Sequence, residues 1–522
     1  MPMPDTHSSV CDFVHLPDEL HVRILLELDI DDLVTCYKIC RVLRNAMEDS
    51  LQLRYRIALA RAGLEDGPSP GRSLIERAQI LAKYGPNRSE SIPCYRFDKQ
   101  CYFVFRDVIG GALVYVVDYS VLEVHEPACI LTDVAEKTWR INLAHSVGSW
   151  ERILRIAISK DKDLLALTTR IEGIHKCYFI SLSHGGLYPS AAHNPLIPAA
   201  ARTSPLQNTI EIVGDLIGWS FDGVQGAHMH VYNWITGQLL WYDKPTTEVR
   251  MYKMVHILNS SHAIKIVHTG ISVSKLASGA PGPTSGTLAK DVCCLQLPPL
   301  AEGLLVDHVR SYCQRPPLHR EASFNYDPDL TVLVLYLHVN GPSRHSTVII
   351  VIPLWTILKT IERISRSASP PTTSASPLLV PWDAWGADGA RIILLPSVDR
   401  YSPDIVSVSG SRVALTFSKR RIPGLRKGEH CEVILFDVHR RLEDSDHGRS
   451  SAGQVFGPSD TAWVSDFYLG ADTTIFRDPV HTRMPYRAWR GKFSPRELLR
   501  TDAGIDVRLI HDGIVNVWGP ES

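Results

Sequence analysis

Hydrophobic residues between positions 16 and 47 recur with the spacing of α-helices. One stripe of the first predicted helix consists of Leu16, Leu20, Ile24 and Leu28. A second stripe, on the far side, consists of Val22, Leu25 and Leu26. A module of about 45 residues cannot bury both stripes, so the surplus apolar face needs a partner. That partner is either the rest of this chain or another protein, and periodicity alone does not choose between them.

Local capping signals divide this region into three short helices. Pro17 suits the first helical position, and Asp18 and Glu19 place negative charge beside the unpaired N–H groups of the first turn. Asp29 is the expected N-cap of a second helix, and a third helix is expected to begin near Cys40. The pattern therefore predicts a small three-helix module.

The helical pattern continues beyond this module. Two further segments end at Gly63 and Gly85, and glycine is the residue preferred just after a helix C-terminus. Their apolar stripes consist of Tyr55, Leu59 and Ala62 in the first segment and of Leu74, Ala78 and Leu81 in the second. We expect a helical linker that packs on the body of the protein and holds the module at a fixed offset.

From about residue 95 the pattern changes to paired apolar runs with turn-rich loops between them, which is typical of β-strands. Six such units follow one another. Marker residues in five of the returning strands are Tyr178, Val231, Val292, Ile349 and Val433, with spacings of 53, 61, 57 and 84 residues. These spacings are near the period of propeller blades with inserted loops. Six units favour a β-propeller of six to eight blades over a β-sandwich or two smaller β domains.

The clearest of these units contains the sequence HVYNWITGQLLW. A strand ends there at Asn233 and Trp234, and Thr236 with Gly237 supplies a hairpin turn. The unit resembles the turn between the last strands of a WD-repeat blade. Near the C-terminus, FSPRELLR predicts a short helix, and IDVRLIHDGIVNVWG predicts a last strand that closes the ring.

The expected fold class is therefore an α+β multidomain protein, in which a three-helix module and a helical linker precede an all-β domain. The predicted boundaries are a disordered N-terminus over 1–14, the helical module over 15–50, the linker over 51–94 and the propeller-like domain over 95–522. Segments rich in Ser, Pro and Gly predict disordered loops near 276–290, 365–377 and 443–454.

The order of residues in the helical module resembles the F-box family. The matching clusters are Leu16-Pro17-Asp18-Glu19-Leu20, Ile24-Leu25, Leu28, Asp32-Leu33, Ile39-Cys40-Arg41 and Arg44. Ile39 stands where the family usually has Val, and Val42-Leu43 stands where it often has an aromatic residue; both are apolar exchanges. The module and the segment after it together resemble large sets of F-box proteins in mushroom-forming fungi.

The resemblance implies that the surplus face packs on a Skp-type adaptor, which joins the chain to a cullin-RING ubiquitin ligase. The residues implied to face the adaptor or to form the module are Leu16, Pro17, Leu20, Ile24, Leu25, Leu28 and Leu33. The β domain would then bind a target protein. This reading makes the chain a non-catalytic substrate-recognition subunit of the ligase, with no catalytic residue, cofactor or metal. Two alternatives stay open, a propeller-fold hydrolase with N-terminal packing helices and an F-box scaffold that acts outside a ligase.

Composition and charge argue against nucleic acid and membranes as binding partners. The chain has 55 basic and 56 acidic residues and a formal net charge of -1, so no global field favours nucleic acid or an anionic membrane. Its first residues have no basic or apolar signal region, and its apolar runs are shorter than the roughly 20 residues that cross a bilayer. The 11 cysteines include no C-x-x-C pair. We expect reduced thiols and a cytoplasmic or nuclear location.

Catalytic sequence motifs give little support to the hydrolase alternative. The sequence contains no G-x-S-x-G, no H-E-x-x-H and no Gly-rich phosphate loop. In GAHMHVYNW, the residues His228, His230, Tyr232 and Trp234 share one strand face, and two imidazoles two residues apart are a possible start of a metal site. No third ligand follows at a recognisable spacing, so we interpret the pair as exposed or hydrogen-bonded strand histidines.

Overall fold

The computed structural model describes residues 16–518 of the 522-residue chain, with gaps. The longer gaps are 98–104, 199–207, 244–253, 278–290, 368–376, 396–404, 418–430, 442–474 and 494–504. The predicted disorder over 1–14, most of the three predicted disordered loops and the helix predicted from residue 494 lie outside the described residues.

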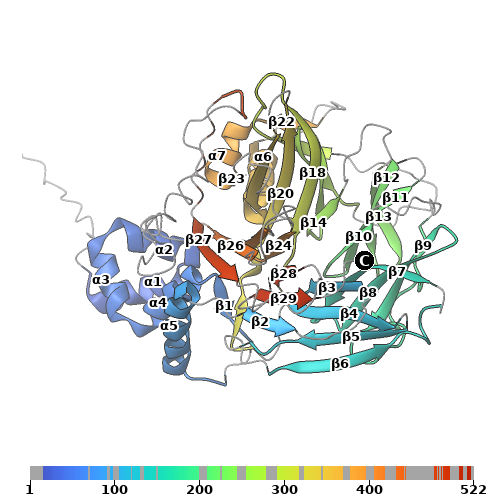
Figure 1. Ribbon diagram of the computed structural model, residues 1–522. Coiled ribbons are helices and arrows are strands. Elements are labelled where there is room, and N and C mark those ends of the chain that lie inside the picture. The colour runs from blue at the N-terminus through green and yellow to red at the C-terminus, as the bar shows by residue number, and fades with distance from the viewer. Residues whose placement is uncertain are drawn as a thin grey trace, which may run out of the picture.

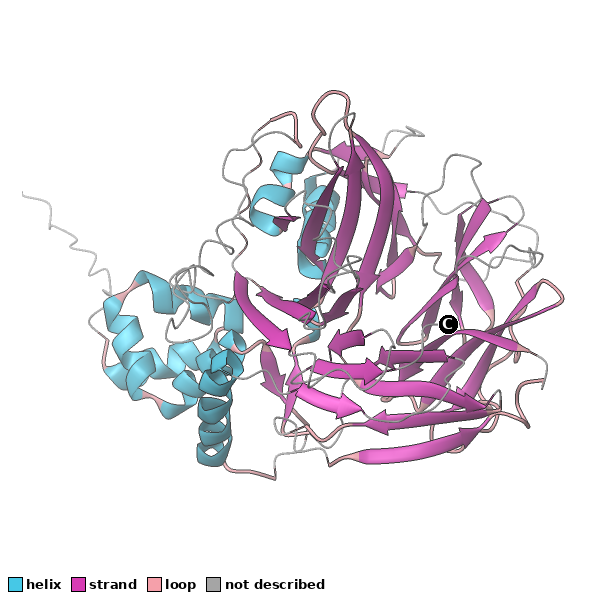
Figure 2. Cartoon of the chain, viewed as in Figure 1, coloured by secondary structure: helices cyan, strands magenta, loops and turns pink. Residues whose placement is uncertain are grey.

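Five helices open the described chain, and they lie together beside the β domain (Figures 1 and 2). They are α1 (Asp18–Glu27), α2 (Ile30–Ile39), α3 (Arg41–Asp49), α4 (Leu51–Arg61) and α5 (Leu74–Glu90). The predicted three-helix module and helical linker are thus confirmed as elements. Pro17 is the N-cap of α1 rather than its first helical residue.

Three further predictions concern where these helices begin and end. Asp29 caps α2 as predicted, because its Oδ1 accepts the N–H groups of Asp31 and Asp32 at 3.0 and 2.9 Å. Gly63 follows α4 with a φ of +68°, the left-handed conformation that suits glycine. The end predicted at Gly85 is wrong, since α5 runs on to Glu90. One interior glycine costs about 1 kcal/mol and does not by itself end a helix.

The β domain is a six-bladed propeller, and each of the six sequence units supplies strands of one blade. The first three blades are β3 (Phe105–Ile109), β4 (Ala112–Asp118), β5 (Val121–Glu126) and β6 (Lys137–Asn142); β7 (Arg152–Ser159), β8 (Leu164–Ile171) and β9 (Ile174–Ser181); and β10 (Asn208–Val213), β11 (Leu216–Gly223), β12 (Gly226–Asn233) and β13 (Gln238–Asp243). The fourth is β14 (Val255–Asn259), β15 (His262–Val267), β16 (Gly270–Lys275) and β17 (Asp291–Gln296), with β22 (Leu378–Val380) added in parallel. The last two are β18 (Leu305–Cys313), β20 (Val332–Asn340), β21 (His345–Pro353) and β23 (Arg391–Leu395); and β24 (Ile405–Ser409), β25 (Arg412–Phe417), β26 (Cys431–Val438) and β27 (Tyr486–Phe493).

A smaller three-stranded sheet joins the two ends of the β domain. In it, β2 (Cys94–Phe97) pairs with β29 (Ile514–Trp518), which also pairs with β28 (Ile505–Leu509). β28 packs against β24 and β25 of the sixth blade. The predicted closing strand is therefore a pair of strands, and it pairs with an N-terminal strand beside the sixth blade.

First strands of neighbouring blades lie next to each other at the centre of the ring, as β3 and β7, β7 and β10, β10 and β14, and β18 and β24 do. Figure 1 shows the sheets arranged around this centre. Between the blades, alternate apolar residues of facing sheets form large cores; one of them joins blade four, blade five and α6 (Leu354–Ser367). That helix follows β21 directly and was not predicted from the sequence. Within the described residues, no helix is long and apolar enough to span a membrane.

The cysteines permit a first test. Seven cysteines in the described part of the chain are free thiols. Burial raises the pKa of Cys293 to about 12, with Cys294 and Asp291 adding to the shift, so this thiol stays protonated and unreactive near neutral pH. We expect the melting temperature to be the same with and without a non-thiol reductant, because none of the seven described cysteines closes a loop covalently. A clear drop on reduction would show that a disulfide stabilises the fold.

Candidate functional site

The helical module buries the second stripe of α1 and leaves the first stripe largely outside its core. The core consists of Leu25, Leu33, Met47, Leu53 and Ile57, with Val22, Leu26 and Leu28 packed against it. These residues come from all four of the first helices. The module therefore fills its interior without a partner, and the surplus face lies on the opposite side of α1.

Two large apolar residues of that surplus face are exposed. Leu20 is 44% exposed and Ile24 is 40% exposed, and residues four apart lie on the same side of a helix. Pro17 is also exposed, Leu16 is half-buried, and Ile39 at the end of α2 is 75% exposed. The adjacent exposed side chains of α1 form the candidate site, which we call the α1 apolar face and define by Pro17, Leu20 and Ile24.

The structure thus divides the seven residues predicted from the F-box resemblance. Leu25 and Leu33 are 1% and 0% exposed and belong to the module core, and Leu28 packs against that core. Pro17, Leu20 and Ile24 remain accessible, with Leu16 beside them. The sequence did not separate these roles because both stripes of α1 are equally apolar.

The module is fixed to the propeller through α4, α5 and a short strand. β1 (Leu64–Asp66) pairs with β19 (Phe324–Tyr326), and only the short 3-10 helix η2 (Pro328–Leu330) separates β19 from β20 of the fifth blade. One apolar cluster joins both sides and consists of Tyr55, Leu59, Leu64, Leu81, Cys129, Phe324 and Tyr326, with Leu74 and Ala78 packed against it. Both predicted linker stripes therefore contact the propeller side, and the linker holds the module in one position.

A buried arginine adds a polar contact between module and propeller. Arg441, 4% exposed, lies shortly after β26 of the sixth blade. Its guanidinium donates to Asp31 of α2 at 2.9 Å and to Asp327, which follows β19. Nearby acids raise the pKa of Arg441 against the opposing effect of its burial, so it stays charged.

Replacing Arg441 by Met tests this contact. Removing one partner of a buried ion pair leaves an uncompensated charge at Asp327 and costs about 3–5 kcal/mol of unfolding free energy. Asp31→Asn is the matched control, because the Asp31 side chain is 38% exposed and its pairing is worth at most about 1 kcal/mol. Urea unfolding of both variants measures the difference; equal, small losses would mean that Arg441 does not stabilise the junction.

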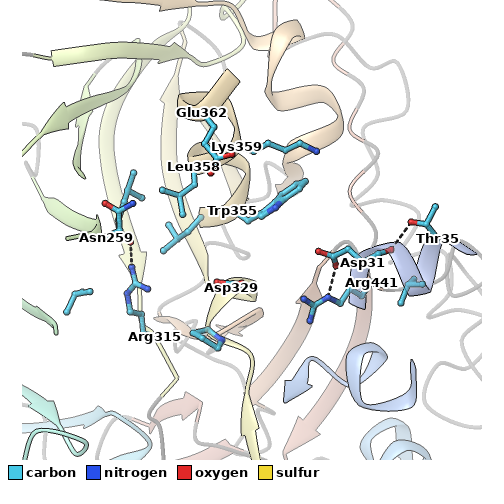
Figure 3. A pocket seen from close by; sticks show the side chains of 15 residues that line it. Asp31, Thr35, Asn259, Arg315, Asp329, Trp355, Leu358, Lys359, Glu362 and Arg441 are labelled. Atoms are coloured by element: carbon cyan, nitrogen blue, oxygen red, sulfur yellow. Dashed lines mark hydrogen bonds and ion pairs between the residues drawn. The ribbon is translucent and has the colours of Figure 1, made fainter. Parts of the chain in front are cut away.

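A cavity of about 930 Å³ opens where the module, α6 and the propeller meet (Figure 3). Asp31, Val34 and Thr35 of α2 line one side. The other lining residues are Val213, Leu258, Asn259, Arg315, Pro328, Asp329, Leu354, Trp355, Leu358, Lys359, Glu362 and Arg441. The Lys359 ammonium lies 4.7 Å from the centre of the Trp355 ring, so the wall presents an aromatic plane beside a positive charge. The cavity therefore combines apolar walls with charged groups of both signs.

Five other tryptophans are buried, unlike Trp355. Trp219, Trp234, Trp241, Trp382 and Trp385 are all less than 9% exposed. They pack between sheets or under α6, whereas Trp355 is half-buried at the cavity wall. The sequence pattern does not distinguish Trp355 from the other tryptophans, because it does not predict the helix α6 that carries this residue.

The two strand histidines form an aromatic cluster. His228 and His230 are 5% and 3% exposed, and His230 Nδ1 lies 2.8 Å from the Tyr232 hydroxyl. The His228 ring stacks on Phe221 with 5.4 Å between ring centres. Burial, with a contribution from His228, lowers the pKa of His230 to about 3, so this imidazole is neutral at physiological pH. Within the described residues they belong to no three-ligand group. Both histidines are buried, so the exposed interpretation is wrong, and the hydrogen-bonded interpretation is confirmed for His230.

Comparisons with known proteins do not assign this chain to a family. No protein-family model matches the chain, and no curated protein matches it. Among solved structures, the WD40 domain of SCAP from fission yeast is 9% identical with a TM-score of 0.32, over 64% of this chain and 71% of that one. The computationally designed Ika8 protein is 8% identical with a TM-score of 0.29, over 66% of this chain and 86% of that one.

A third similar structure, prolyl oligopeptidase B from Galerina marginata, is 10% identical with a TM-score of 0.26, over 80% of this chain and 61% of that one. Likeness at this level supports no inference about function. The class that the molecule itself defines is a β-propeller protein with an N-terminal helical module, and this assignment rests on its sheets. The resemblance to the F-box family rests on the order of residues between Leu16 and Arg44 alone.

Proposed function

We propose that this protein is a substrate-recognition subunit of a Skp/cullin/F-box ubiquitin ligase. The observation that carries the proposal is the α1 apolar face, which stays exposed although the module has a complete core of its own. An apolar helix face of this kind binds a complementary protein surface. The order of residues in α1 to α3 resembles an F-box, and the Skp-type adaptor is the partner that this resemblance implies.

The propeller is the proposed receptor for the target protein. The cavity beside α6 offers an aromatic plane, apolar walls and charges of both signs, which are the features that bind a peptide segment. The cavity is lined by α2 of the module and by the propeller, so a segment bound there would lie beside the module that we propose binds the adaptor. Ubiquitin transfer then depends on tethering, which raises the local concentration of acceptor lysines, and no residue of this chain reacts.

A fixed linker between the helical module and the propeller supports the proposal that the first binds the adaptor and the second binds the target. The β1–β19 pairing, the shared apolar cluster and Arg441 hold the α1 apolar face in a constant position relative to the propeller. A constant offset presents the target at a constant distance from the ligase. A long flexible connection would spread that distance and lower the effective concentration.

One observation favours the hydrolase as a second candidate. Ser311 Oγ lies 2.9 Å from Nε2 of His256, whose Nδ1 lies 3.1 Å from Oε2 of Glu211. This is the order of a nucleophile, a base and an orienting carboxylate. Ser311 is 2% exposed, however, and a nucleophile has to reach its substrate. The receptor is therefore the function that the geometry supports better.

Reconstitution tests the proposed function. The purified full chain, mixed with a Skp-type adaptor, should form a stable one-to-one complex and bring a cullin with it, as measured by size-exclusion chromatography with light scattering. The same preparation should not hydrolyse model ester or peptide substrates faster than its Ser311→Ala variant does. Absence of an adaptor complex would contradict the receptor, and hydrolysis that Ser311→Ala abolishes would support the second candidate.

A further inference from the structure

Three successive blades bring metal-ligating side chains together near the centre of the propeller. Glu211 lies on β10, His256 on β14 and Cys313 at the end of β18, and each of these is the first strand of its blade. One ligand atom from each residue lies within 4.8 Å of the others. A tetrahedral zinc ion with its usual bond lengths separates its ligand atoms by roughly 3.3–3.6 Å. The three side chains therefore need only small adjustments to share one ion.

A fourth residue holds the histidine in a suitable orientation. Ser311 Oγ lies 2.9 Å from His256 Nε2, so a hydrogen bond there leaves Nδ1 to carry the lone pair. That Nδ1 lies 3.1 Å from Glu211 Oε2, close to the separation of two ligands on one zinc ion. Metal-binding histidines in proteins commonly have their second ring nitrogen fixed in this way.

The donor types indicate which ion fits. One carboxylate oxygen, one imidazole nitrogen and one thiolate sulfur suit zinc, whereas magnesium and calcium prefer oxygen ligands alone. The two negative charges of carboxylate and thiolate balance a divalent cation. Such neutrality matters because the His256 side chain is 5% exposed and that of Glu211 is 17% exposed.

The surroundings of the three residues leave room for an exchangeable ligand. Val213, Leu258 and Arg315 each lie two residues farther along the same three segments, and all three line the cavity beside α6. A zinc ion with three protein ligands keeps one coordination position for water or another donor. Ligands that enter the cavity would thus come close to the ion.

We propose that Glu211, His256 and Cys313 form a three-ligand zinc site that ties blades three, four and five together at the centre of the propeller, with Ser311 as the residue that positions the histidine. This inference does not rest on the proposed ligase function, because the three residues lie on the propeller and not on the α1 apolar face. The alternative outcome is a polar cluster that joins the blades by hydrogen bonds alone.

Metal analysis of the full chain tests the site. After incubation with zinc sulfate and removal of free metal, mass spectrometry should find about one zinc per chain. His256→Ala and Cys313→Ser should retain less than a tenth of that amount. Cys177→Ser is the matched control, because Cys177 is a buried free thiol on β9 outside the cluster, and it should retain the full amount. Equal zinc in the native chain and in Cys313→Ser would overturn the proposal.

Two further measurements keep the test decisive if a ligand variant unfolds. Ser311→Ala keeps all three ligands and should weaken zinc binding by roughly 10- to 100-fold in a competition titration, as loss of an outer partner typically does. Cobalt added to the native chain should give the absorption of a cobalt–thiolate bond, and Cys177→Ser should give it too. No such band in the folded native chain, or unchanged zinc affinity in Ser311→Ala, would count against the site. Adaptor binding should be the same for Cys313→Ser and the native chain, so failure of one proposal is distinguishable from failure of the other.

Discussion

Replacing Leu20 and Ile24 together by aspartate should abolish binding to a Skp-type adaptor while the chain stays folded. Both side chains are at least 40% exposed, so the change creates no cavity in the module. Each is expected to contribute as an interface anchor worth about 2 kcal/mol, and charge in an apolar interface adds a desolvation cost. The affinity should therefore fall by at least about 100-fold. Isothermal titration calorimetry measures the affinity, and thermal unfolding checks the fold.

Two matched variants separate the interface from the core. Ile75→Asp places the same charge on an isoleucine of α5 that is 57% exposed, and it should leave adaptor affinity unchanged. Leu25→Ala removes a side chain that is 1% exposed in the module core and should lower the unfolding free energy by about 2–5 kcal/mol. If Ile75→Asp weakened the adaptor as much as the double variant does, the α1 apolar face would not be the interface.

Strong local patterns made most of the architecture predictable. The two stripes of α1, the cap at Asp29 and the six paired apolar runs all reappear as helices, a cap and blades. The hairpin at Thr236 and Gly237 is also present, with Gly237 at a φ of +71° and the Asn233 side chain accepting the Thr236 N–H at 3.0 Å. These features depend on neighbours in the sequence, which is why the sequence alone predicts them.

The inner strands were harder to predict because they lack that local signal. β10 and β18 mix polar with apolar residues over short stretches, and most of their residues are half-buried or exposed. Glu211 and Cys313 belong to these two strands, His256 belongs to β14, and the three residues lie far apart in the sequence. The available signal was the blade period, which places first strands of successive blades at similar intervals. A search for polar residues, as well as apolar markers, at the blade period would have grouped these three residues.

The face of α1 that stays exposed was unpredictable for a different reason. Its two stripes have similar hydrophobicity, and only the positions of Leu33, Met47, Leu53 and Ile57 decide which one is buried. Those positions depend on how three other helices pack. The packing of α4 could not be predicted from the sequence either, because this helix contributes to two different cores. Leu53 and Ile57 belong to the module core, and Tyr55 and Leu59 belong to the apolar cluster at the propeller junction. Cutting the chain near residue 50 or 95 would therefore damage one core or the other, and point variants are the safer probes.

Two double variants together should show that transfer of ubiquitin needs both sites in the same chain. Trp355→Ala with Lys359→Ala removes the aromatic plane and the charge at the cavity wall and should abolish capture of the cellular target, while adaptor binding stays intact. The Leu20→Asp, Ile24→Asp chain should have the opposite defect. In a reconstituted ligase, each variant alone should fail to modify the target.

Mixing the two variants is the decisive arm of this experiment. If transfer depends on tethering, the mixture should remain inactive, because no single chain then holds both the adaptor and the target. Each preparation has an internal control, since the first still binds the adaptor and the second still binds the target in pull-downs. Recovery of transfer in the mixture would contradict the tethering mechanism, and it would point instead to a chain that acts on its target without being bound to the ligase.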